Sequence, residues 1–179
     1  YCDNRKILSH PAVRTFVRQL TNELIEKRFG KPDGIAGVAT GGIALGALVA
    51  QEMGVPFCYV RSSAKSHGTG QQVEGDLDTM RNVVVVEDLI STGKSSLNAV
   101  AALREANLEV KGLVAIFSYG FEDSVTRFED SKCAFEVLTD YPTMLEQALS
   151  EGYVTQDQAS LLEAWSEDPV AWSEQQSKS

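Results

Sequence analysis

Four consecutive valines at residues 83–86 constrain the fold of this chain more than any other stretch. An uninterrupted run of β-branched residues is typical of a strand that is buried on both faces, as in a parallel sheet. Glu87 and Asp88 follow directly, and residues 97–103 have the composition of a helix. The segment therefore predicts a strand, a polar loop and a helix. Other strands and helices alternate along the chain, which predicts an open α/β sheet.

The loop that joins this strand to its helix is rich in small hydroxylated side chains. It contains Ser91, Thr92, Gly93, Lys94, Ser95 and Ser96. Its amides would converge on a helix N-terminus, which is a favourable place for an anion and above all for a phosphate. The two preceding carboxylates are poorly placed for further phosphate, but they are well placed to accept hydrogen bonds from sugar hydroxyls. Together the two parts predict a pocket for a ribose 5-phosphate.

Two other interpretations of this segment can be compared with the sequence. A nucleoside-triphosphate P-loop also ends in Gly-Lys-Ser, but it requires a glycine five residues before Gly93, where this chain has Asp88. The P-loop interpretation therefore fails. The second alternative is an ordinary strand-to-helix connection in which Ser and Thr only cap the helix. The adjacent carboxylates, in one unit with the loop, favour the binding site over this capping role.

Residues 83–96 strongly resemble the segment with which type I phosphoribosyltransferases bind phosphoribosyl pyrophosphate (PRPP). The Glu-Asp-Leu-Ile-Ser-Thr-Gly order is similar in particular to the orotate phosphoribosyltransferases. The resemblance implies an α/β fold with an open, mainly parallel twisted sheet, helices on both faces and an N-terminal hood. It also implies that Glu87 and Asp88 bind the ribose, with Asp88 among the catalytic residues, and that residues 91–96 bind the 5-phosphate.

A second glycine-containing turn, Thr40-Gly41-Gly42, follows the predicted strand at residues 35–39. Glycines let the backbone approach a ligand closely at the carboxyl end of a strand. The spacing is not that of a dinucleotide-binding motif. In the family that the chain resembles, a pyrophosphate-binding loop lies here, which implies that all three residues bind the substrate. Several members carry a lysine in that loop, and this chain has none.

The segment at residues 61–75 is long, polar and punctuated by glycine, with no hydrophobic period. Such loops are lids or flexible surface segments, and the residues alone leave both open. Arg61, Lys65 and His67 would suit a lid that closes over a polyanion. The Arg-x-x-Ala-Lys-x-His-Gly order is similar to the catalytic loop of orotate phosphoribosyltransferases. It implies that these three residues are catalytic and reach the neighbouring subunit's site in a homodimer; Ser62 departs from the second lysine of many members.

The sequence indicates the residues that would recognise the base less clearly than those for the phosphate and ribose. The resemblance implies that Tyr1 and Asp3 bind near the base, with Arg5 close by, and the position of residues 118–121 suggests a floor for the base. Some family members hold the base with an arginine there, which this chain lacks. Terminal helices are expected at residues 141–149 and 155–165. Trp165 and Trp172 are interpreted as packing residues.

Length and charge narrow the possible functions. A chain of 179 residues suits one domain, expected at residues 1–172, with a disordered polar tail at 173–179. The net charge of −9 argues against general nucleic-acid binding. No stretch has the length of a membrane span, no signal peptide is visible, and three widely spaced cysteines fit reduced thiols in the cytoplasm. The chain opens at Tyr1 without Met, so we expect an incomplete N-terminal hood.

The resemblance implies a specific reaction, the Mg²⁺-dependent transfer of 5-phosphoribosyl from PRPP to orotate in pyrimidine biosynthesis. The Mg²⁺ is expected to be held mainly by substrate oxygens, with no dedicated protein site. Two alternatives stay open. One is a phosphoribosyltransferase for another nucleobase, and the other is a non-catalytic, PRPP-binding regulator on the same fold. Neither membrane nor nucleic acid is expected as a partner.

Overall fold

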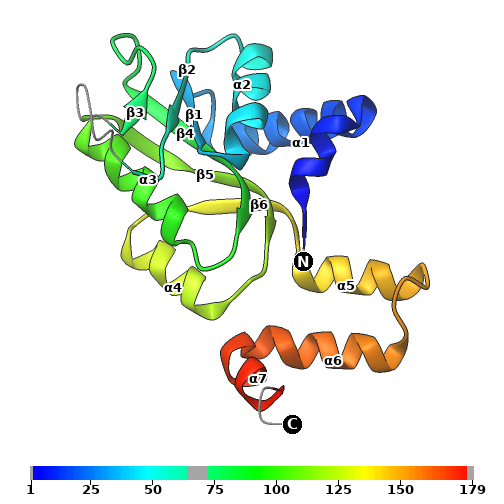
Figure 1. Ribbon diagram of the computed structural model, residues 1–179. Coiled ribbons are helices and arrows are strands. Elements are labelled where there is room, and N and C mark those ends of the chain that lie inside the picture. Colours follow the sequence, from blue (N-terminus) through cyan, green and yellow to red (C-terminus); the bar gives the residue numbers. More distant parts are fainter. Residues whose placement is uncertain (1, 64–71, 177–179) are drawn as a thin grey trace.

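The computed structural model describes residues 2–63 and 72–176, and its centre is a six-stranded sheet with the order β3-β2-β1-β4-β5-β6 (Figure 1). The strands are β1 (Gly34–Val38), β2 (Phe57–Val60), β3 (Val73–Glu74), β4 (Asn82–Ile90), β5 (Glu109–Ser118) and β6 (Phe135–Asp140). Neighbouring strands are parallel, except that the short edge strand β3 runs antiparallel to β2. The predicted mainly parallel α/β sheet is therefore confirmed.

Helices cover both faces of this sheet, as expected. They are the 3₁₀ helix η1 (Asn4–Ser9) and the α-helices α1 (Pro11–Phe29), α2 (Gly41–Met53), α3 (Lys94–Glu105), α4 (Glu122–Asp130), α5 (Tyr141–Ser150), α6 (Gln156–Glu167) and α7 (Pro169–Gln176). One face carries α1 and α2 and the other carries α3 and α4 (Figure 1). Helix α5 continues from β6, and α6 runs back alongside it.

The valine run of β4 explains the two-layered core. Val83 and Val85 pack with α3, while Val84 and Val86 pack with α1 and α2, and all four side chains are fully buried. Successive side chains of a strand point to opposite faces, so a central strand needs apolar residues at every position rather than at alternate ones. This is the physical reason why an unbroken valine run predicts a parallel strand in the middle of the sheet.

The parallel arrangement brings the polar ends of three strands to one edge. Gly37 of β1 pairs with Val86 of β4, and Leu89 of β4 pairs with Phe117 of β5. The loops that follow β1, β4 and β5 therefore emerge side by side at the carboxyl edge. Ligands of open α/β sheets bind at this edge, and the predicted binding residues are concentrated there.

The C-terminal helices have clear local signals. Thr155 and Gln158 form a capping box at the start of α6, as such a spacing favours. In α7, the Asp168 carboxylate accepts a hydrogen bond from the Ala171 amide. Helix α7 extends to Gln176, so the first four residues of the predicted disordered tail are helical.

Within the described residues, no helix combines the length and apolar character needed to cross a membrane.

Candidate active site

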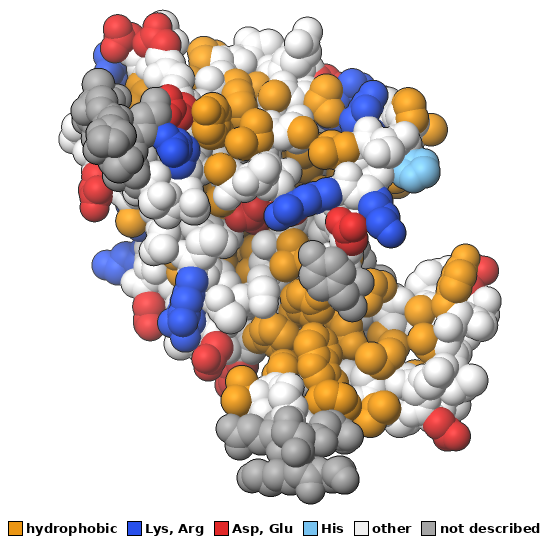
Figure 2. All heavy atoms as spheres, in the orientation of Figure 1, with side chains coloured by type: hydrophobic (Ala, Val, Ile, Leu, Met, Phe, Trp, Pro, Cys, Tyr) orange, Lys and Arg blue, Asp and Glu red, His pale blue; other side chains and the backbone are white. Residues whose placement is uncertain are grey.

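A cleft of about 1240 Å³ lies at the carboxyl edge of the sheet. Its walls come from the N-terminal residues, the loops after β1, β4 and β5, and the junction of α6 with α7. In Figure 2, hydrophobic side chains gather in the hollow between the main body and the C-terminal helices. Nine of the residues predicted to bind substrate line this cleft: Asp3, Thr40, Gly41, Glu87, Asp88, Ser91, Thr92, Gly93 and Ser95.

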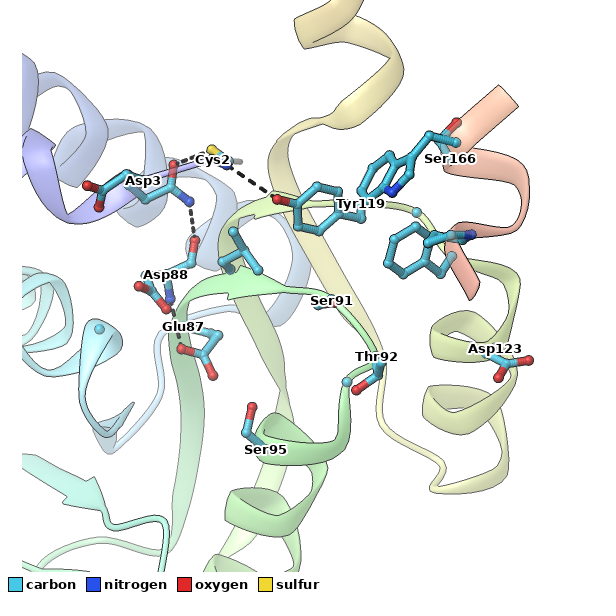
Figure 3. A pocket seen from close by; sticks show the side chains of 18 of the residues that line it. Cys2, Asp3, Glu87, Asp88, Ser91, Thr92, Ser95, Tyr119, Asp123 and Ser166 are labelled. Carbon is cyan, nitrogen blue, oxygen red and sulfur yellow. Dashed lines mark hydrogen bonds between the residues drawn. The ribbon is translucent and has the colours of Figure 1, made fainter. Parts of the chain in front are cut away.

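The loop after β4 has the geometry of an anion site. Gly93 is the N-cap of α3 and adopts the left-handed conformation, with φ of 75°. A Cβ atom there would lie 2.9 Å from the ring of Phe128, so only glycine fits without a shift. Figure 3 shows Ser91, Thr92 and Ser95 together at this end of the cleft. The α3 N-terminus with these hydroxyls is suited to a phosphate.

Two residues predicted to bind the phosphate have other surroundings. The Ser96 side chain is buried, and its hydroxyl donates a hydrogen bond to Glu87 Oε2 at 3.1 Å. Lys94 is exposed and is not among the residues that line the cleft. In the structure, Ser96 therefore positions a carboxyl group instead of facing the anion site.

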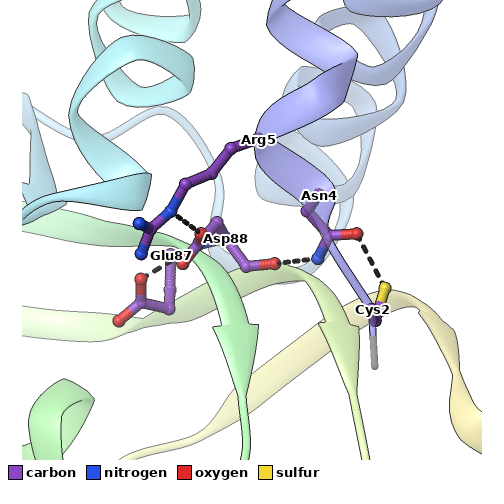
Figure 4. Close-up of polar contacts among 5 residues, drawn as sticks. All are labelled: Cys2, Asn4, Arg5, Glu87 and Asp88. Carbon is purple, nitrogen blue, oxygen red and sulfur yellow. Dashed lines mark hydrogen bonds and ion pairs between the residues drawn. The ribbon is translucent and has the colours of Figure 1, made fainter.

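The adjacent acidic residues have different environments. Glu87 is only 4% exposed, and its Oε1 accepts a hydrogen bond from the Asp88 amide at 3.0 Å. Burial, followed by the side-chain hydrogen bond with Asp88, raises the pKa of Glu87 to about 9. The Asp88 carboxylate instead accepts a hydrogen bond from Arg5 Nε at 3.3 Å (Figure 4). The protonated form of Glu87 is thus favoured at neutral pH, directly beside the Asp88 carboxylate that pairs with Arg5.

The turn after β1 presses against these carboxyl groups. A Cβ atom on Gly41 would lie 1.9 Å from Asp88 Oδ2, and one on Gly42 would lie 2.3 Å from the Val86 carbonyl oxygen. Both glycines are therefore required for the close approach of this turn to β4. Thr40 is the N-cap of α2 and lines the cleft with Gly41, whereas Gly42 is buried and is not a lining residue.

The N-terminal residues are tied to the same edge. Asn4 Nδ2 donates to the Asp88 carbonyl oxygen at 2.7 Å, and the Cys2 amide donates to Tyr119 Oη at 3.3 Å (Figure 4 shows the first contact). Asp3, which stands between Cys2 and Asn4 in the chain, lines the cleft. Tyr1 lies outside the described residues, so its predicted role near the base stays a prediction.

The structure describes only the two ends of the predicted catalytic loop. The Arg61 amide donates to the Gln72 carbonyl oxygen at 3.0 Å, and Gln72 Nε2 donates to the Arg61 carbonyl oxygen at 2.7 Å. The Arg61 guanidinium lies 3.5 Å from Glu74, and Arg61 is not among the residues that line the cleft. Lys65 and His67 lie outside the described residues, and their catalytic roles remain predictions.

An aromatic wall closes the far side of the cleft, and the sequence predicts only part of it. Tyr119 and Phe121 follow β5 with their rings stacked at 5.4 Å, and Trp165 of α6 packs edge-on against both, at 5.7 and 6.0 Å. All three line the cleft. The sequence places residues 118–121 near the base by position alone. It indicates only packing for Trp165, because nothing in it shows where α6 folds back.

The described residues offer little to hold a metal ion. They contain no group of three or more His, Cys, Asp or Glu side chains arranged around a common point. In the pair at the end of β4, Glu87 is neutral at pH 7 because its pKa is raised, and the Asp88 carboxylate is engaged by Arg5. Such a donor set fits a Mg²⁺ ion that is bound mostly by phosphate oxygens and water, as is usual for this ion.

Comparison with known proteins agrees with this geometry. Residues 3–153 match the family model described as the phosphoribosyl transferase domain. The chain is 48% identical over 172 residues to an orotate phosphoribosyltransferase of Phocaeicola vulgatus, an alignment that covers 96% of this chain and 81% of that protein. An orotate phosphoribosyltransferase of Listeria innocua is 46% identical over the same length, with 82% of it covered.

Solved structures share the fold. The orotate phosphoribosyltransferase of Aeropyrum pernix superposes with a TM-score of 0.73 at 24% identity, covering 87% of this chain and 85% of that one. The UMP synthase of Leishmania donovani superposes with a TM-score of 0.77 at 23% identity, covering 92% of this chain and 35% of that longer one. The chain therefore belongs to the phosphoribosyl transferase family, in the branch of the orotate phosphoribosyltransferases.

Proposed function

We propose that this protein transfers the 5-phosphoribosyl group of PRPP to orotate, forming orotidine 5′-phosphate and pyrophosphate in the synthesis of UMP. One observation carries the proposal. A phosphate-suited helix N-terminus, a pair of carboxyl groups and a glycine turn meet in one cleft, in a chain that is 48% identical to an orotate phosphoribosyltransferase. The order of these groups across the cleft follows the order of the parts of PRPP.

Each part of the substrate has a candidate partner. The loop at Ser91, Thr92 and Ser95 would bind the 5-phosphate through its hydroxyls and the α3 amides. Glu87 and Asp88 would hold the ribose hydroxyls. The turn at Thr40 and Gly41 would bind the pyrophosphate through backbone amides and one hydroxyl, because no lysine is present in it. Arg5, the one cationic side chain among the described lining residues, would be released from Asp88 as the sugar enters.

The reaction breaks the bond between C1 of the ribose and a pyrophosphate oxygen and forms a bond from C1 to a ring nitrogen of orotate. The proton of that nitrogen is released to the pyrophosphate or to water. The leaving pyrophosphate gains negative charge, while the sugar passes through a state with oxocarbenium character. Catalysis is therefore mainly positional and electrostatic. Glu87 and Asp88 orient the sugar, and the Asp88 carboxylate favours positive charge on the ring. No side-chain nucleophile is needed.

We infer that Mg²⁺ takes part as a substrate-bound ion. Mg²⁺ neutralises charge on pyrophosphate oxygens when it is bound, and the sparse carboxylate set of the described cleft fits an ion held mainly by the substrate. Asp88 is the described residue best placed to contact its hydration shell, because its carboxylate lies against Gly41 of the pyrophosphate turn.

We infer further that the segment at residues 61–75 supplies Lys65 and His67 to the pyrophosphate of a neighbouring subunit, which would make the active form a homodimer. The acidic character of the described lining supports this part of the proposal. The polyanionic pyrophosphate of PRPP needs more cations than Arg5 alone offers. The cytoplasm is the expected location, since all three cysteines, each in the described part of the chain, are free thiols.

A base panel tests the proposal. The protein would be incubated with PRPP, Mg²⁺ and, separately, orotate, uracil, hypoxanthine or adenine, and the nucleotide products would be separated by chromatography. We expect orotidine 5′-phosphate alone. Formation of a different nucleotide would assign the chain to another base, and binding of PRPP without any product would indicate a regulator.

A further inference from the structure

The helix α6 contributes to the cleft from a part of the chain far from the phosphate and ribose residues. Its Trp165 belongs to a separate hydrophobic cluster with Phe117, Tyr119 and Tyr141. The Trp165 ring lies 5.4 Å from Tyr141 and 5.7 Å from Tyr119. Because Tyr141 begins α5, these contacts fasten α6 to the end of the sheet and keep its last turn at the cleft.

Tyr119 is fixed from two sides. Its amide donates to the Ile90 carbonyl oxygen at 3.0 Å, which places it beside the end of β4, and its hydroxyl accepts a hydrogen bond from the Cys2 amide at 3.3 Å. Figure 3 shows its ring reaching across the cleft toward Cys2. The Trp165 ring packs against it in a T-shaped arrangement from the α6 side. The side chain is thus clamped between the N-terminal segment and the C-terminal helices.

The second ring of the wall depends on Trp165 still more. Phe121 stacks on Tyr119 with an interplanar angle of 7°, and Trp165 packs against it at 68°. The intervening residue, Gly120, has φ of 71°, and a Cβ atom added there would meet no other atom within 4 Å. The Gly120 amide donates to Ser118 Oγ at 3.0 Å and so fixes the backbone between the two rings, while packing among the rings holds the orientation of the side chains.

This wall lies where a base on a bound ribose would reach. Glu87 and Asp88 lie in the carboxyl-terminal half of β4, two to three residues before its end, and Tyr119 follows the adjacent strand β5, with Leu89 paired to Phe117 near the ends of both strands. The stacked rings are too close together to admit a further ring between them, so a base would lie against the wall and not inside it. A planar pyrimidine is the type of ligand that such a face accommodates.

We propose that Trp165 is a positioning residue for the base: from α6 it fixes the orientation of Tyr119 and Phe121, which form the face against which the pyrimidine lies. The C-terminal helices are thereby part of the substrate site and not only packing elements. This inference rests on the proposed function, because it assigns the aromatic wall to the base half of the same cleft.

The kinetic test compares Trp165→Ala, Trp165→Phe and a matched control, Trp172→Ala. Trp172 lies on α7 and is neither a lining residue nor part of a described aromatic pair. We expect Trp165→Ala to raise the KM for orotate about tenfold, which corresponds to the free energy of one aromatic contact. The KM for PRPP should stay nearly unchanged. Trp165→Phe should recover most of the loss, and Trp172→Ala should resemble the wild type. Equal changes in both KM values, or none, would overturn the inference.

A spectroscopic test covers the case in which Trp165→Ala does not fold. The chain has two tryptophans, so Trp172→Phe leaves Trp165 as the single reporter. We expect orotidine 5′-phosphate to change its emission, while ribose 5-phosphate, which lacks the base, leaves it unaltered. Identical responses to both ligands, or no response to either, would refute the base wall. If the wild-type protein consumes no orotate in the base panel, the proposed function is refuted. The difference in Trp165 emission between orotidine 5′-phosphate and ribose 5-phosphate still tests the base wall in that case.

Discussion

The buried carboxyl group of Glu87 makes the stability of this protein depend on pH in an unusual direction. Its pKa is raised to about 9, first by burial and then by the hydrogen bond with Asp88, whereas an exposed glutamate in an unfolded chain has a pKa of about 4.3. Between these values, the folded state holds a proton that the unfolded state has released. Stability contributed by this group is therefore fully present at low pH and is lost as the pH rises.

The magnitude follows from proton linkage. A single group of this kind changes the free energy of unfolding by at most about 1.4 kcal/mol per pH unit. Between pH 6 and pH 8 the wild type should thus lose up to about 3 kcal/mol from Glu87. Glu87→Gln removes the titration but keeps an oxygen for the Asp88 amide and an NH₂ group facing the Ser96 hydroxyl. We expect this variant to lack that loss and to exceed the wild type in stability at pH 8.

The assay is urea unfolding followed by circular dichroism at pH 6, 7 and 8, with a linear extrapolation to water at each pH. The matched control is Glu105→Gln, which makes the same chemical change at an exposed position of α3. The difference between Glu87→Gln and the wild type should grow with pH, whereas the control should track the wild type. Parallel stability curves for Glu87→Gln and the wild type would refute the reasoning.

Four further changes test other parts of the site. Gly41→Ala forces a Cβ atom to within 1.9 Å of Asp88, so we expect PRPP affinity, measured by calorimetry, to fall at least about tenfold with the fold retained in circular dichroism. Gly93→Ala should lower the free energy of unfolding in urea by about 1–2 kcal/mol, because its φ of 75° is strained for alanine; an unchanged value would contradict the assigned conformation. Asp88→Asn should lower kcat in the orotate assay more than it raises the KM for PRPP, and the reverse pattern would limit Asp88 to binding. Lys65→Ala should abolish most turnover without changing the melting temperature, and full turnover would exclude the lid assignment.

The sheet and the phosphate loop are predictable because their signals are local. The valine run at residues 83–86 indicates a strand that is buried on both faces. The hydroxyl-rich loop with Gly93 indicates the N-terminus of a helix. The carboxyl pair is adjacent in sequence and directly follows the valine run, so its place near the carboxyl edge of the sheet is predictable, although β4 continues past it to Ile90. In a parallel sheet, the carboxyl ends then meet by geometry, which brings Thr40 and Gly41 into the same cleft.

The features that depend on distant contacts are not predictable in this way. Ser96 belongs to the segment predicted to bind the phosphate, yet its hydroxyl faces Glu87, because α3 turns that side chain toward β4. The two-residue strand β3 also lacks a clear local pattern. Trp165 has no local signal for a binding role, since its position depends on how α6 packs against Tyr119 and Tyr141. Hydrophobic periodicity predicts that a segment is helical, but it does not predict which part of the protein that helix packs against.

The stoichiometry of the reaction tests the central claim most directly. Orotate consumption would be followed by absorbance, and pyrophosphate release by a coupled assay, in the same mixture of protein, PRPP and Mg²⁺. We predict one pyrophosphate released for each orotate consumed, and no release when orotate is omitted. Pyrophosphate release at the same rate without orotate, or no consumption of orotate at all, would contradict the assignment of this cleft to phosphoribosyl transfer to orotate.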